Sequence, residues 1–250
     1  MDFLLSPDGV LIAAACAVAI MFGGLVKGTL GVGLPLFAVP IMSLMIGSTQ
    51  AIALVAVPVL VSNIWQAWQE GNWKASVKRF WPLMVTQGMM TVLAVQWTLD
   101  FSVKQLNMLV AFAVVLAVVA MLFKPSFNIP PEREKWVGAL VGATSGLLGG
   151  VSSLMGPILI SYTMSLKMQR DEFVGAISII YLNAAWPLYL AMFSFGRMAT
   201  VDLGYSVLAL VPMAVGLTIG QKLRHRLSED AFRKVLLAFL IFVATLLVLR

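Results

Sequence analysis

The chain is a succession of ten apolar runs separated by short polar stretches. None of the runs alternates like a strand or carries the polar face of a soluble amphipathic helix. About 20 apolar residues in a helix, and at least about 17, cross the hydrocarbon core of a membrane, and most runs reach that length. The pattern predicts an all-α integral membrane protein with about eight to ten transmembrane segments. The runs are residues 10–26, 34–46, 49–69, 80–97, 105–123, 136–148, 153–166, 173–195, 203–221 and 235–249.

Three runs, 34–46, 136–148 and 153–166, are too short to span a membrane on their own. Each lies beside a glycine-rich stretch, and glycine allows the backbone to leave the helical conformation. We therefore expect broken or short helices at these places. Such segments either cross the membrane as a pair or enter it and return.

Composition supports the membrane prediction and excludes several other classes. Of the 250 residues, 60% are hydrophobic and only 11% are charged, whereas a soluble domain carries about 25% charged residues. A soluble domain, a disordered chain, a nucleic-acid-binding protein and a disulfide-stabilised secreted module are all disfavoured. The single cysteine, Cys16, lies in an apolar run and is interpreted as a packing residue. The N-terminus lacks a basic region, so we expect the first apolar run to remain in the mature protein.

The charged loops predict an orientation. The net charge of +6 comes from basic residues in short loops, which argues against a polyanionic partner. Cytoplasmic loops carry an excess of Lys and Arg, and placing both termini outside puts most basic residues inside. The loops left outside hold Asp100, Lys104, Arg197 and Asp202. The inside residues are Lys74, Lys78, Arg79, Lys124, Arg133, Lys135, Lys167, Arg170, Lys222, Arg224, Arg226, Arg233 and Lys234.

The chain also repeats itself. Residues 22–35 have a glycine-rich counterpart in 140–153, and the later parts of the halves align without gaps, Pro82 with Pro212 and Asp100 with Asp230. Each half holds five runs, an odd number, so the halves face opposite ways. We expect a first repeat over 1–123, a connecting loop over 124–135 and a second repeat over 136–250. Inverted repeats are typical of secondary transporters, whose substrates bind near the midplane at broken helices. A duplicated membrane scaffold without a substrate is the alternative.

Specific motifs give a family resemblance. The segment from Val26 to Pro35, VKGTLGVGLP, and its second copy from Gly146 to Ser153, GLLGGVSS, are each followed by helices with Asn and Pro. This arrangement resembles the sulfite exporter TauE/SafE family of the toluene sulfonate uptake permease superfamily over essentially the whole chain. The second copy has serines in place of the family's usual glycine triplet. The resemblance implies transport of small sulfur-containing anions, namely sulfite, sulfonates or sulfoacetate, across a bacterial plasma membrane, with some relatives exporting and others importing.

The two breaks are the predicted substrate site. Helices that restart after Gly33 and Gly150 would direct free N–H groups and positive dipole ends at an anion. Close helix packing by the glycines and interhelical hydrogen bonding by the asparagines are the alternatives. The candidate residues of the breaks and of the two equivalent asparagines are Gly28, Gly31, Gly33, Pro35, Asn63, Gly146, Gly149, Gly150, Ser152, Ser153 and Asn183.

Two further side chains complete the candidate site. Lys27 lies in the predicted first break and is flanked on both sides by long apolar sequence. An ionisable residue within the membrane is a functional-site hypothesis by default, and a lysine would hold an anion as a point charge. The alternative is a lysine that anchors the helix at the membrane surface. Its repeat partner is Ser145, which makes the site asymmetric. Trp186, close to Asn183, is predicted to line the pathway.

The residues that are missing bear on mechanism. No Asp or Glu lies inside an apolar run, and the one histidine, His225, lies in a basic loop. A buried proton relay is therefore disfavoured, and an anion leaving an inside-negative cell gains about 2.3 kcal/mol per 100 mV without a coupling ion. Export is favoured, while uptake coupled to H⁺ or Na⁺ and a non-transporting membrane assembly factor remain alternatives. The chain offers no set of metal ligands or catalytic residues, so we expect no enzyme activity, cofactor or metal.

Overall fold

The computed structural model describes residues 7–122, 129–166 and 168–223, and all regular elements in these ranges are α-helices. The all-α prediction is confirmed. The predicted run 235–249, the loop with His225 and residues 124–128 of the loop 124–135 lie outside the described residues, as do both termini.

The described ranges hold eleven helices, and each of the first nine predicted runs corresponds to one helix or to a pair. The helices are α2 (Pro7–Leu30), α3 (Leu34–Ile46), α4 (Ser48–Leu54), α5 (Ala56–Glu70), α6 (Trp73–Trp97), α7 (Val103–Leu122), α8 (Pro131–Ser152), α9 (Gly156–Ser165), α10 (Arg170–Ser194), α11 (Thr200–Leu208) and α12 (Leu210–Leu223).

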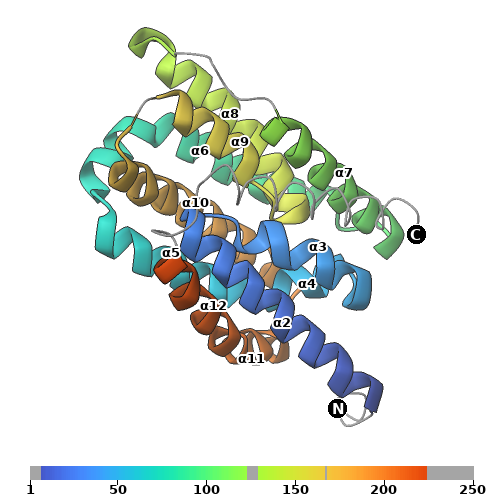
Figure 1. The fold of residues 1–250 in the computed structure, drawn as a ribbon. Helices are drawn as coiled ribbons and strands as arrows, with labels where there is room; N and C mark the ends of the chain where they lie inside the picture. The colour runs from blue at the N-terminus through green and yellow to red at the C-terminus, as the bar shows by residue number, and fades with distance from the viewer. Residues whose placement is uncertain (1–6, 123–128, 167, 224–250) are drawn as a thin grey trace.

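The helices form two groups with a central pair between them. In Figure 1, α6, α7, α8 and α9 lie on one side, α2, α11 and α12 lie on the other, and α10 and α5 lie between them. The most extensive packing joins α6 to α8 and α2 to α12, followed by α5 with α10. Each outer pair therefore combines one helix from the first half of the chain with one from the second half.

Glycines bring α2 and α12 together. A side chain on Gly24 would meet the carbonyl oxygen of Met213 at 2.5 Å, and one on Gly28 would overlap the carbonyl oxygen of Leu217. The contacts advance along both helices in the same direction, so α2 and α12 are parallel. Small residues that allow two backbones to approach are typical of helix pairs in membranes.

The pair α6 and α8 is built in the same way. Side chains on Gly142 and Gly146 of α8 would overlap the carbonyl oxygens of Leu83 and Gln87 of α6. These contacts also advance in the same direction along both helices. A second parallel pair therefore repeats the contacts of the first.

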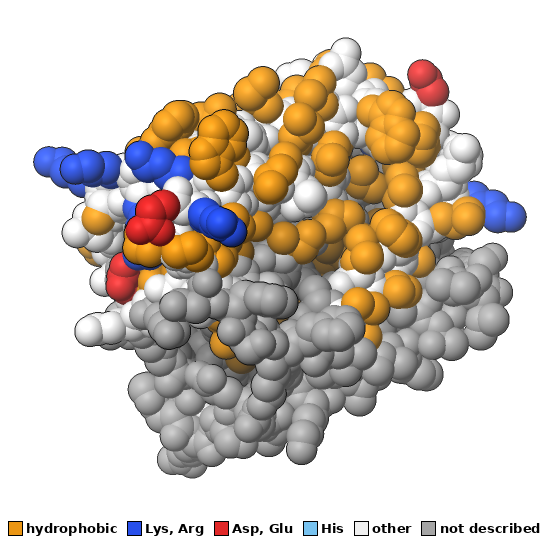
Figure 2. Space-filling model, turned by 90° about the horizontal axis from the view of Figure 1, so that it is seen from above, with side chains coloured by type: hydrophobic (Ala, Val, Ile, Leu, Met, Phe, Trp, Pro, Cys, Tyr) orange, Lys and Arg blue, Asp and Glu red, His pale blue; other side chains and the backbone are white. Residues whose placement is uncertain are grey.

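Three described helices are long and apolar enough to cross a membrane: Gly9–Leu30, Glu172–Ser194 and Thr200–Leu223, the last joining α11 and α12. The bent pair α4 and α5 gives a fourth candidate, and Leu34–Ile46 and Val103–Leu116 are shorter apolar helices. Figure 2 shows apolar side chains covering the middle of one face, with charged side chains towards its two ends. The distribution is that of a protein whose outer surface meets lipid.

The structure corrects the predicted positions of the breaks. α2 continues through Lys27 and Gly28 to Leu30, so these two residues are helical and the first break is residues 31–33. The run 136–148 is part of a longer helix, because charged residues before it and glycines after it extend α8 to 22 residues, but α8 is not one of the helices apolar enough to span a membrane. A helix restart after Gly150 is also wrong, since α9 begins at Gly156.

An additional bend, absent from the predicted segments, divides the run 49–69. α4 and α5 meet at Val55 with an angle of 40°. Pro58 has no N–H to donate to the carbonyl of Leu54, four residues earlier. The Ser206 hydroxyl on α11 donates to that carbonyl at 2.9 Å and accepts from the Val57 N–H, also at 2.9 Å. One side chain therefore satisfies both backbone groups left free by the bend.

We expect Ser206→Ala to lower the free energy of unfolding by about 1–3 kcal/mol, because it leaves buried backbone groups without partners. Ser206 is fully buried, whereas Ser194 is exposed. Thermal unfolding in detergent should show a lower melting temperature for Ser206→Ala and no change for Ser194→Ala. Equal melting temperatures for Ser206→Ala and the wild type would mean that water replaces the hydroxyl at the bend.

Candidate functional site at the two helix breaks

Lys27 is a buried lysine in the last turns of α2. Its side chain is 3% exposed, and Nζ donates to Oδ1 of Asn63 on α5 at 2.7 Å. The Asn63 amide group in turn donates to the carbonyl oxygen of Val59 at 2.8 Å. Among the described residues, no carboxylate forms an ion pair with Lys27. The ion pairs in this part of the chain are those of Arg79 with Glu134 and Glu172. A buried charge without a counter-ion is costly, so this lysine favours a bound anion.

The polar surface continues along α5. Gln66 lies one turn beyond Asn63 on the same helix face and is 3% exposed. Its Oε1 accepts a hydrogen bond of 3.2 Å from the hydroxyl of Ser178 on α10. Lys27, Asn63, Gln66 and Ser178 thus form a buried polar series from α2 across α5 to α10.

The first break is shaped by two glycines with left-handed backbone. Gly31 has φ 82° and Gly33 has φ 107°, values that favour glycine over any residue with a Cβ. Pro35 follows in the first turn of α3, where its missing N–H costs nothing. The Gly31 N–H donates to the carbonyl oxygen of Lys27 at 2.7 Å and closes the last turn of α2.

The second break contains a strained serine. Ser153, which ends α8, has φ 61° and is the non-glycine residue with positive φ in the described ranges. For a residue with a Cβ this conformation costs on the order of 1–2 kcal/mol, and such strain clusters at functional sites. The hydroxyl of Ser152 donates to the Leu148 carbonyl at 2.6 Å and accepts from the Leu154 N–H at 3.2 Å.

Residues next to the two breaks belong to the same buried apolar clusters. Val32 of the first break and Met155 of the second belong to one buried apolar cluster. Val26, just before the first break, and Leu154 belong to another. Residues more than 120 positions apart therefore share parts of one buried core.

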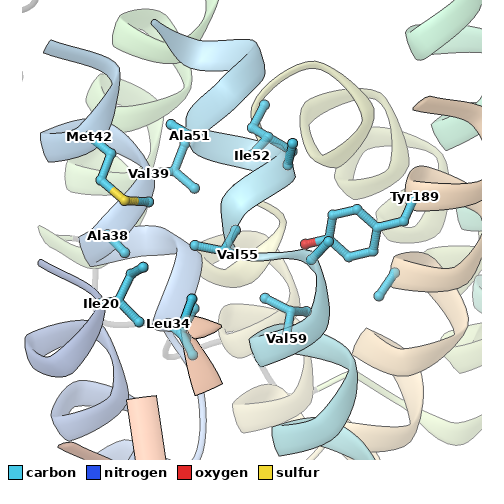
Figure 3. Packing of buried hydrophobic residues seen from close by; sticks show 14 of the residues in the cluster. Ile20, Leu34, Ala38, Val39, Met42, Ala51, Ile52, Val55, Val59 and Tyr189 are labelled. Atoms are coloured by element: carbon cyan, nitrogen blue, oxygen red, sulfur yellow. The ribbon is translucent and has the colours of Figure 1, made fainter. Parts of the chain in front are cut away.

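Buried polar atoms without partners surround the second break. The hydroxyl of Tyr181 lies over Gly156, and the hydroxyl of Tyr189 lies close to Ser153 but outside hydrogen-bonding geometry. Figure 3 shows Tyr189 reaching from α10 towards Val55, at the bend between α4 and α5. Oε1 of Gln87 on α6 also has no partner among the described residues. Buried polar groups are normally satisfied, so these atoms mark a place for a polar ligand or water.

Several predicted site residues lie elsewhere. Asn183 is half-buried and donates to the Met84 carbonyl on α6 at 2.9 Å. Trp186 is 49% exposed and lies on the outside of α10, away from the breaks. Gly28 and Gly146 pack against neighbouring helices as described above, and Gly149 contacts the side chain of Met155. We do not place Asn183 or Trp186 among the residues that surround the breaks.

The polar side chains that the sequence prediction missed are Gln66 and Ser178 of the buried polar series, and Gln87, Tyr181 and Tyr189 around the second break. Gln87 is visible as a polar residue inside an apolar run, and it donates to the hydroxyl of Ser145 at 3.2 Å. Tyr181 and Tyr189 are eight positions apart and thus share one face of α10. Nothing in their local sequence distinguishes them from aromatic packing residues.

Apolar spanning helices, two buried helix breaks and unpaired polar groups around them define a multi-pass membrane protein of the transporter type. The sequence profile of the sulfite exporter TauE/SafE family matches residues 16–247, and the chain belongs to this family. The predicted resemblance is confirmed. Membership implies a membrane transporter of sulfur anions such as sulfite, in a family of transporters and not of enzymes. No curated protein and no solved structure matches the chain.

Proposed function

We propose that the protein is a secondary transporter that exports small sulfur-containing anions, such as sulfite, sulfonates or sulfoacetate, across a bacterial plasma membrane by alternating access. The observation that carries this proposal is the buried Lys27, which has an amide partner in Asn63 and no ion-pair partner among the described residues. A transporter of anions needs a site whose positive charge attracts the substrate but does not hold it so tightly that release becomes slow. A lysine held by a neutral amide meets that need, because its charge is not neutralised by the protein.

The substrate site that we propose lies between the two breaks. Lys27 and Asn63 hold the anion from one side, and the backbone at Gly31 and Gly33 allows it to approach closely. Ser152 and Ser153 complete the wall of the site from the second break. The Ser152 hydroxyl is engaged with the Leu148 carbonyl, and the unpaired hydroxyls of Tyr181 and Tyr189 add donors. Hydroxyl and amide donors around one fixed cation suit a sulfur oxyanion, whose oxygens accept several hydrogen bonds.

Alternating access follows from an inverted repeat, which two observations support. The pair α2 and α12 repeats the glycine contacts of α8 and α6. Ser48, which follows α3, and Gly150, near the end of α8, line the same cleft. Since α3 returns antiparallel to α2, this cleft is at the end where α2 begins and α8 finishes. The equivalent helices α2 and α8 therefore run in opposite directions, as rocking of one repeat against the other requires.

The distribution of charge supports a cytoplasmic position for the opposite end. Arg79 bonds to Glu134 at 2.6 Å and to Glu172 at 3.2 Å, which places the beginnings of α6, α8 and α10 at one end. Lys74, Lys78 and other basic residues lie near the same helix ends, and an excess of Lys and Arg marks the cytoplasmic side. We infer that both termini lie outside. The inside-negative potential then drives anions outward without a coupling ion.

The test is transport by the purified protein in lipid vesicles. Labelled sulfite, sulfoacetate and toluene sulfonate are offered with and without an imposed potential, and empty vesicles serve as the control. We expect saturable uptake that rises when the interior is positive and falls when it is negative, as the movement of net negative charge requires. Folded protein that moves none of the three anions would refute the transport proposal and favour a non-transporting assembly factor.

A further inference from the structure

A cleft lies at the end of the bundle where the loop 195–199 joins α10 to α11. The cleft contains about 250 Å³ of space, part of it open to solvent. Helices α4, α7, α8 and α10 contribute to its wall together with the loop. The lining residues are Ser48, Thr49, Ile52, Leu106, Gly150, Val151, Met192 and Arg197.

The backbone holds Arg197 in this wall. Gly196 has φ 72° and ends α10 in a Schellman motif, in which the Arg197 N–H donates to the Met192 carbonyl at 2.8 Å. The Gly196 N–H donates to the Phe193 carbonyl at 3.1 Å in the same motif. The position of Arg197 at the cleft is therefore set by the end of α10 and not by a flexible loop.

The guanidinium of Arg197 has donors to spare. One nitrogen donates to the hydroxyl of the buried Thr98 at 3.0 Å, and a guanidinium carries five N–H donors. Burial lowers the pKa of Arg197 and the charge of nearby Asp100 raises it, but no carboxylate pairs with it within the described ranges. Arg197 stays cationic at every physiological pH, so it contributes to the cleft wall a positive charge that has no ion-pair partner among the described residues.

Ser48 gives an independent sign that the cleft takes a polar ligand. Its side chain is 1% exposed and its hydroxyl has no hydrogen-bond partner, although it lines the cleft. The backbone N–H of Ser48 is already occupied by Oδ1 of Asn107 at 3.2 Å. Ser48 and Arg197 thus line one space, and each has a donor that is not used within the described residues.

We propose that this cleft is an anion-binding vestibule of the transport pathway, in which Arg197 and Ser48 receive a small sulfur oxyanion outside the central site. The inference rests on the proposed transport function and adds a second binding step to it. Gly150 and Val151, which line the cleft, directly precede the second break at Ser152 and Ser153, so the vestibule adjoins the part of the central site that the second break forms. The enclosed part of the cleft has room for about one water molecule in this structure, so the anion occupies it in a more open state.

Thiol labelling tests whether the cleft opens and prefers anions. Ser48→Cys is prepared in a Cys16→Ala background, which removes the only native thiol. The variant in membranes is treated with two methanethiosulfonates, one bearing a sulfonate and one bearing a trimethylammonium group. We expect the ratio of labelling rates, anionic reagent over cationic reagent, to be higher at the introduced thiol than at a small thiol in solution. Ethanesulfonate should slow the labelling of the introduced thiol. Adding Arg197→Gln should reduce that preference about fivefold, while Arg197→Lys should retain it.

A transport measurement separates this proposal from the central one. In reconstituted vesicles of known orientation, Arg197→Gln should raise the half-saturating concentration about fivefold for anion offered at the cleft side, and Asp100→Asn should lower it. The value for the opposite side should not change. Wild-type protein that transports while Ser48→Cys shows no labelling, or no dependence on Arg197, overturns the vestibule alone. Wild-type protein that transports no sulfur anion overturns the central proposal as well.

Discussion

Replacing Lys27 with methionine is expected to reduce anion transport by about 100-fold or more while leaving the protein at least as stable as the wild type. Removing one partner of a buried charged interaction costs about 3–5 kcal/mol of that interaction, here the binding of the anion. In the empty protein, however, the lysine is a buried cation with an amide as its partner. Replacing such a charge with an apolar residue of similar volume is neutral or stabilising by about 1–4 kcal/mol.

The combination of lost transport and retained stability is what identifies a binding residue. Initial rates of sulfite uptake and thermal unfolding in detergent should be measured on the same preparation. Lys78→Met is the matched control, because it removes the same charge from an exposed position on α6. A Lys27→Met protein that transports at the wild-type rate would return Lys27 to a structural role. Loss of transport together with loss of folding would show that the lysine holds α2 against α5.

Asn63 offers a second route to the same conclusion. Asn63→Asp keeps the shape of the side chain but gives Lys27 the counter-ion that it lacks. The resulting internal ion pair would compete with the substrate, so transport should fall although the lysine is still present.

The helices themselves could be predicted from the sequence because apolar runs decide which segments can enter lipid. Their ends could not. α8 begins at Pro131, five residues before the apolar run, since its charged first turn is stabilised at the polar end of the bundle by the bonds between Glu134 and Arg79. Its last turn runs through Gly149, which the Met155 side chain contacts, and Gly150, against which α6 packs directly.

The candidate site was predictable in its sequence motifs but not in its pairings. Lys27 stands out as an isolated charge, yet its partner Asn63 is 36 positions away. Their contact depends on the register of α2 against α5, which a hydrophobic pattern does not specify. The sequence pattern places Arg197 in an outer loop, and only the end of α10 at Gly196 brings it into a cleft wall.

The glycines show why one motif supports two interpretations. A glycine needed for a break has an unusual φ, as Gly31 and Gly33 have. A glycine needed for packing has ordinary helical backbone and a neighbour where its Cβ would be, as at Gly28 and Gly146. The letters of the sequence are the same in both cases. The structure separates them, and the separation can be tested.

Gly28→Ala and Gly146→Ala are each expected to destabilise the protein by about 1–3 kcal/mol, the usual cost of overpacking. A methyl group at either position would overlap a backbone carbonyl of the partner helix, that of Leu217 or of Gln87. A backbone carbonyl cannot rotate away as a side chain can, so each helix pair must separate. Because the two contacts repeat each other, the two variants should lose similar amounts of stability.

Gly204→Ala is the matched control, because Gly204 lies on the exposed face of α11 with no atom within 4 Å of the added Cβ. It should gain roughly 0.5–1 kcal/mol through the higher helix propensity of alanine. Thermal unfolding measures all three variants, with a shift of about 2–4 °C for each kcal/mol. The anion affinity of the remaining folded protein distinguishes the two interpretations. Unchanged affinity with reduced stability makes Gly28 and Gly146 packing residues, whereas weakened binding at full stability would place them in the wall of the substrate site.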